Sequence, residues 1–76
     1  MMSSRDMMVM DMVDRLVSLR EGSMEVLQIG QYDIVWSAYQ RGGEYEVHLA
    51  DSDHTEYVPY TDVIVLAEAI ADGTAY

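Results

Sequence analysis

The segment Asp51–Glu56, with the sequence DSDHTE, is the one part of the chain that has the chemistry of a metal site. It offers carboxylate, hydroxyl and imidazole groups, and the spacing of Asp51 and Asp53 matches the start of a calcium-binding loop. Such a loop needs glycine at its sixth position, where Glu56 stands, and a helix on either side. Because Asp, Ser and His are also common in tight turns, we interpret the segment as a polar turn, with a weak cation site as the alternative.

Two histidines, His48 and His54, are the side chains best suited to acid–base catalysis. The chain has no cysteine to act as a nucleophile, and none of its serines lies in a nucleophile-elbow sequence. The pair Gly42-Gly43 has neither the spacing nor the following helix of a phosphate-binding loop. The sequence therefore predicts a protein that is not an enzyme and that binds no metal or cofactor.

The charge of the chain is its most unusual property. Fourteen Asp and Glu residues face four Arg and no Lys, which gives a formal net charge of -10. The acidic residues run from Asp6 to Asp72 and are shared among all predicted elements, so the charge belongs to the folded surface. A field of this sign repels nucleic acids and anionic lipids and attracts basic protein surfaces. We expect a protein partner with a basic surface, and no direct binding of nucleic acid or membrane.

The length of 76 residues suits one domain, spanning 1–76. No apolar run approaches the roughly 18 residues that a membrane span needs. The methionine-rich start has neither the basic region nor the cleavage site of a signal peptide. We therefore expect a cytoplasmic protein.

Helices are predicted at both ends of the chain, over residues 3–20 and 62–72. Ser3 or Ser4 is the expected N-cap of the first helix, and Thr61 caps the second. Each helix carries an apolar stripe with the helical period. The predicted core positions are Met8, Val9, Met12, Val13, Leu16 and Leu19 in the first helix, and Val63, Leu66, Ala67 and Ile70 in the second.

Alternation of apolar and polar residues predicts strands between the helices, over residues 24–29, 32–40, 44–51 and 55–58. Glycines suggest a two-residue turn at Gly30-Gln31 and another at Gly42-Gly43. The second turn sets Trp36 opposite Leu49 and Ala38 opposite Val47. The expected fold is α+β, a single small domain whose antiparallel three- or four-stranded meander carries both helices on one face.

This arrangement leaves the other face of the sheet uncovered. On the expected register Val26, Val35 and Ala50 form its apolar centre, with acidic side chains around them. The face is either an ordinary solvated surface or a protein-binding surface, including a homodimer interface. The candidate partner-binding residues on this face and the adjacent turn are Asp33, Tyr39, Glu44, Glu46, His48, Asp51, Asp53 and Glu56.

Methionine is concentrated at the start of the chain, where six of the seven residues lie between Met1 and Met12. Met8 and Met12 fall on the predicted core stripe. Met7 and Met10 fall outside it, and methionine is common at adaptable binding surfaces. We therefore add Met7 and Met10 to the candidate partner contacts.

In size and charge the chain resembles phage-encoded DNA mimics and anti-CRISPR or anti-restriction proteins. This resemblance implies an inhibitor whose carboxylates take the place of phosphates in the basic groove of a partner, in the cytoplasm of a phage host. The alternative is salt adaptation, in which many acidic residues and no lysine keep a small structural or regulatory dimer soluble in a high-salt cytoplasm.

Overall fold

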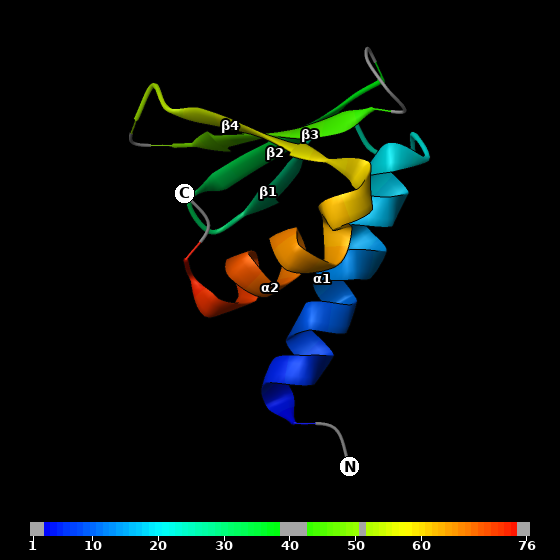
Figure 1. Ribbon diagram of the computed structural model, residues 1–76, viewed down its shortest axis with the longest axis vertical. Helices are drawn as coiled ribbons and strands as arrows, with labels where there is room; N and C mark the ends of the chain where they lie inside the picture. Colours follow the sequence, from blue (N-terminus) through cyan, green and yellow to red (C-terminus); the bar gives the residue numbers. More distant parts are fainter. Residues whose placement is uncertain (1–2, 39–42, 51, 75–76) are drawn as a thin grey trace.

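The structure, a computed structural model, describes residues 3–38, 43–50 and 52–74. Its four strands form one antiparallel sheet in the order β1-β2-β3-β4. Both helices lie on one side of this sheet (Figure 1), which confirms the expected α+β meander with its helices on one face. The elements are α1 (Ser4–Arg20), β1 (Leu27–Ile29), β2 (Tyr32–Ser37), β3 (Glu44–Leu49), β4 (Thr55–Pro59), the 3-10 helix η1 (Tyr60–Asp62) and α2 (Val63–Asp72).

The first helix begins and ends close to the predicted positions. The Ser3 side chain accepts a hydrogen bond from the backbone N–H of Asp6 (3.1 Å), as expected of an N-cap. The predicted cap of the second helix was wrong. The short η1 follows Pro59 and includes Thr61, so α2 begins at Val63 and no side chain caps it. Its other end is as predicted, with Gly73 in the left-handed region (φ 71°).

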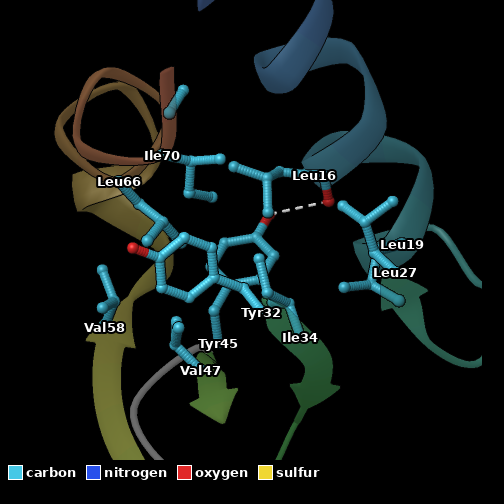
Figure 2. Packing of buried hydrophobic residues seen from close by; sticks show 11 residues of the cluster. Leu16, Leu19, Leu27, Tyr32, Ile34, Tyr45, Val47, Val58, Leu66 and Ile70 are labelled. Atoms are coloured by element: carbon cyan, nitrogen blue, oxygen red, sulfur yellow. Dashed lines mark hydrogen bonds between the residues drawn. The ribbon is translucent and has the colours of Figure 1, made fainter. Parts of the chain in front are cut away.

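The core lies between the sheet and the two helices. Its buried members come from both α-helices and all four strands of the described chain and are Leu16, Leu19, Leu27, Tyr32, Ile34, Tyr45, Val47, Val58, Leu66, Ala67 and Ile70. Tyr45 is the largest fully buried side chain. Its hydroxyl donates a hydrogen bond to the backbone carbonyl of Leu16 (2.9 Å), as Figure 2 shows. This bond joins the start of β3 to α1 and satisfies the one polar atom that the buried ring carries.

The apolar stripe of α1 is shorter than the sequence suggests. Leu16 and Leu19 are buried and Met12 is half-buried, but Met8 is 49 % exposed. Figure 1 shows the reason, because the first turns of α1 extend away from the sheet. The prediction of Met8 as a core residue was therefore wrong, since none of the described strands lies opposite the start of the helix to cover it.

The pairing of β1 with β2 was predicted correctly. Leu27 lies opposite Ile34, and Ile29 lies opposite Tyr32 across the two-residue turn. Gly30 has a positive φ of 57°, which suits the first position of such a turn.

The pairing of β2 with β3 differs from the prediction by four residues. Trp36 lies opposite Tyr45 instead of Leu49, and Ser37 and Glu44 form the last pair. The Trp36 and Tyr45 rings meet edge to face with their centroids 4.9 Å apart. Trp36 also covers Gly43, where any Cβ atom would overlap the indole ring. The predicted turn at Gly42-Gly43 was therefore wrong, because Gly43 makes room for an aromatic ring.

Three of the strands are also shorter than predicted, whereas β4 extends one residue further, to Pro59. The connection before β1 includes Met24, whose side chain packs against the core instead of lying on the uncovered face. The second strand ends at Ser37, and the predicted end of that strand, residues 39–40, lies outside the described residues. The third strand ends at Leu49, so the prediction to residue 51 was too long.

We predict that Tyr45→Phe lowers the free energy of unfolding by about 1 kcal/mol, because the buried hydrogen bond to the Leu16 carbonyl is lost. The melting temperature Tm should fall by about 4–8 °C. Tyr57→Phe is the matched control, since the Tyr57 ring is 57 % exposed, and it should change stability by less than about 0.5 kcal/mol. Equal effects of the two substitutions would contradict the role of this bond.

Tyr45 should also make the free energy of unfolding depend on pH in the alkaline range. Burial raises the pKa of the Tyr45 phenol. Above a pH of about 10 the unfolded chain loses this proton while the folded chain retains it, so the free energy of unfolding falls as the pH rises. Urea unfolding between pH 8 and pH 11 should therefore show a steeper loss for the wild type than for Tyr45→Phe.

Candidate protein-binding face

The side of the sheet opposite the helices, called here the open face, consists of three rows of side chains set by the strand register. Alternate residues of a strand point to the same side, and paired residues lie next to each other across the sheet. The rows are Gln28–Asp33–His48–Thr55, Val35–Glu46–Tyr57 and Ser37–Glu44–Pro59. No helix of the described residues covers this face (Figure 1).

Three of the predicted acidic residues lie together on the open face. Asp33, Glu44 and Glu46 are all partly exposed, one in each row. Glu44 and Glu46 are alternate residues of β3, so their Cα atoms are about 7 Å apart. The pairing error did not affect this result, because a register shift by an even number of residues keeps each side chain on its own face.

His48 also lies on this face, as predicted, between two carboxylates. It is opposite Asp33 across the sheet, and its Nε2 atom is 3.7 Å from Glu46 Oε1. Its Nδ1 atom forms a hydrogen bond with Thr55 Oγ1 on β4 (3.0 Å). A hydroxyl, an imidazole and a carboxylate are thus adjacent, but 3.7 Å is too long for a hydrogen bond to Glu46. The arrangement fixes the orientation of the imidazole ring, whose side chain is 42 % exposed.

Tyr57 is a member of the open face that the sequence analysis missed. Its ring is 57 % exposed and lies in the central row, next to Glu46. Two residues that were expected there, Val26 and Ala50, lie outside the strands, one before β1 and one after β3. The alternation within β4 could have identified Tyr57, because Val58 points into the core and its neighbour must point away.

The other predicted contacts lie elsewhere. Glu56 pairs with Val47, which puts it on the side of the sheet that carries the helices, where its Oε1 atom forms a hydrogen bond with His54 Nε2 (2.6 Å). Asp53 is exposed in the turn before β4. Tyr39 and Asp51 lie outside the described residues.

The two methionines among the predicted contacts are far from the open face. Met7 and Met10 are 63 % and 55 % exposed and belong to α1, on the helix side of the sheet. They therefore belong to a different surface from the carboxylates of the open face.

The positive charges of the described chain are concentrated in α1. Arg5 forms ion pairs with Asp72 (2.8 Å) and Glu68 (3.4 Å) of α2. These hydrogen bonds raise the pKa of the Arg5 guanidinium, and the bond from Arg5 lowers the pKa of Asp72. Arg15 pairs with Asp11 one turn away (3.0 Å).

The last arginine of α1, Arg20, lies over the ring of Tyr60, with 5.9 Å between the guanidinium carbon and the ring centroid. Arg41 lies outside the described residues. Within the described strands, histidine is the one side chain that can become positive, and only when it is protonated. The carboxylates of the open face therefore have no arginine partner among the described residues.

Among the residues that the structure describes, no three Asp, Glu or His side chains are arranged closely enough to hold one metal ion. Asp51, the first residue of the candidate cation loop, is not among them. In the same part of the chain, neither helix is long and apolar enough to cross a membrane.

Comparison of the chain with protein-family models, with curated proteins and with solved structures gave no significant match.

Proposed function

We propose that this protein is a non-enzymatic interaction module that inhibits a partner protein by occupying its basic, nucleic-acid-binding surface. The observation that carries the proposal is the open face, where Asp33, Glu44 and Glu46 lie on one uncovered sheet surface with no arginine beside them among the described residues. Carboxylates placed in this way present negative charge to a partner at fixed positions, since each projects from a paired strand.

The composition of the open face supports the same function. Val35 and Tyr57 lie in its central row beside Glu46, and polar residues occupy the rows on either side. An aromatic side chain within a polar rim is typical of protein interfaces, where tyrosine often provides much of the binding energy. We propose Tyr57 as the apolar anchor and the three carboxylates as the groups that contact basic side chains.

Charge also favours a basic partner over a second copy of the chain. Two copies that met through this face would bring together six carboxylates from two molecules of net charge -10. Like charges at an interface oppose association, whereas a surface rich in Arg and Lys would pair with them. The inhibitor would be of the phage anti-defence, anti-CRISPR or DNA-mimic type, and would act in the cytoplasm of the host.

The direct test is neutralisation of the open face in the triple variant Asp33→Asn, Glu44→Gln, Glu46→Gln. The matched control is Asp6→Asn, Glu21→Gln, Asp62→Asn, which removes three exposed carboxylates from the helix side and from the connections there. The immobilised wild type is used to capture proteins from a nuclease-treated bacterial lysate, and duplex DNA is then added to release them. The affinity of each protein released in this way is measured for all three forms.

We expect the open-face variant to bind the released protein at least about 100-fold more weakly, since each charge-assisted contact contributes about 1.5–3 kcal/mol. The control variant has the same net charge and should stay within about fivefold of the wild type, because its carboxylates lie beyond the contact and are screened. Equal losses in both variants, or a bound protein that DNA does not displace, would contradict the proposal.

Salt adaptation is the alternative reading of the acidity, and it is favoured by the spread of exposed carboxylates over both sides of the molecule. Thermal unfolding in potassium chloride distinguishes the two. On the inhibitor proposal the domain is folded without added salt, and Tm rises by no more than about 8 °C up to 2 M because screening removes about 1 kcal/mol of repulsion. A domain that is unfolded at low salt and gains stability up to molar concentrations would support salt adaptation instead.

A further inference from the structure

An apolar groove runs between α1 and α2 on the helix side of the molecule. It has a volume of about 280 Å³ and is lined by Val9, Met10, Val13, Asp14 and Ile64. Met10 and Ile64 are 55 % and 59 % exposed, so the side chains that border the groove from the two helices are open to water. Val9 and Val13 also pack against the core, but the exposed side of the groove takes no part in the proposed open-face function.

Sequence and helix geometry explain why the groove is apolar. α2 has the sequence VIVLAEAIAD, so that apolar side chains lie on nearly all sides of this helix. The sheet and α1 bury only the side that carries Leu66, Ala67 and Ile70. Leu66 and Ile70 fill the core, and Ile64 is left at the edge that faces α1. On α1 the first turns extend away from the sheet (Figure 1), which leaves Met10 uncovered.

We propose that this groove binds an amphipathic helix with a basic polar face, supplied by another protein. The lining comes from two helices that cross each other (Figure 1), and side chains from both can contact a ridge of apolar residues spaced three or four positions apart on a bound helix. Methionine suits such a site, because its flexible side chain adapts to the shape of the bound residue.

The charge around the groove identifies the occupant as basic. Asp14 is part of the lining, and Asp6 lies one helical turn before Met10 on the same face of α1. Asp62 is exposed just before Ile64. A helix whose apolar residues entered the groove would place its flanking polar side chains near these carboxylates, where Lys or Arg would be favoured.

The same observations disfavour a second copy of the chain. A copy would bring its own net charge of -10 to an acidic surface. The groove itself, at about 280 Å³, holds a few inserted side chains and not the broad surface of a whole domain. A single helix fits the size of the groove better than a whole domain does.

The probe for the test is a fluorescent 18-residue peptide in which Leu occupies one helical face and Lys the other. A scrambled peptide of the same composition, with Leu on all sides, is its control. Binding is measured by fluorescence anisotropy at about 0.15 M salt, where long-range attraction is screened. Spectra of ¹³C-methyl methionine show where the peptide binds, and we expect the Met10 methyl signal to move while that of Met24 stays in place.

The informative variants are Ile64→Gln and its matched control Val65→Gln. Both side chains are about equally exposed, at 59 % and 62 %, but Val65 does not line the groove. We expect Ile64→Gln to weaken binding of the amphipathic peptide at least about tenfold, because its apolar contact is lost. Val65→Gln should stay within about twofold. The open-face triple variant should keep most of its affinity for the peptide, which separates this inference from the proposed function.

Three results would overturn the inference. Equally tight binding of the scrambled and the amphipathic peptide would mean that charge alone is recognised. An unchanged affinity in Ile64→Gln would place the peptide elsewhere. Sedimentation of the free protein as a dimer that Ile64→Gln dissociates would assign the groove to a second copy.

Discussion

Tyr45 lies where the central strand β3 meets α1, with its ring buried and its hydroxyl bonded to the Leu16 carbonyl. The position of the other elements depends on this contact. It holds α1 against one side of the sheet, and α2 packs beside α1 on the same side (Figure 1). The described residues form two α-helices, and both cover the same face of the sheet. The other face is left to water, and its residues need not be apolar.

The described arginines and the carboxylates of the open face lie on different sides of the sheet. The described arginines belong to α1, where Asp11, Glu68 and Asp72 or the ring of Tyr60 accompany them. The carboxylates of the open face project from paired strands, and no described arginine accompanies them. On the proposed function, the paired strands already fix the backbone of these residues, so that binding of a basic surface would order only their side chains. The groove beside Met10 offers a second, apolar surface on the opposite side of the molecule, so two contacts with different chemistry are available.

Much of this arrangement could be predicted from the sequence, because alternation decides which way each strand residue points. Asp33, Glu44, Glu46 and His48 were placed on the open face correctly although the pairing of β2 with β3 was wrong by four residues. That pairing depends on the contact of Trp36 with Tyr45 and Gly43, which periodicity does not reveal. The groove was missed for a similar reason, since the exposure of Ile64 depends on how the two helices pack.

The affinity of the open face for a DNA-displaceable partner, measured from about 0.05 to 0.5 M salt, tests the central claim most directly. Carboxylates that pair with a basic surface should give an affinity that falls steeply as salt rises, because screening weakens each exposed pair. The open-face variant should show a much shallower dependence than the wild type. An affinity that does not change over this range would contradict the claim that the open face acts through its charge.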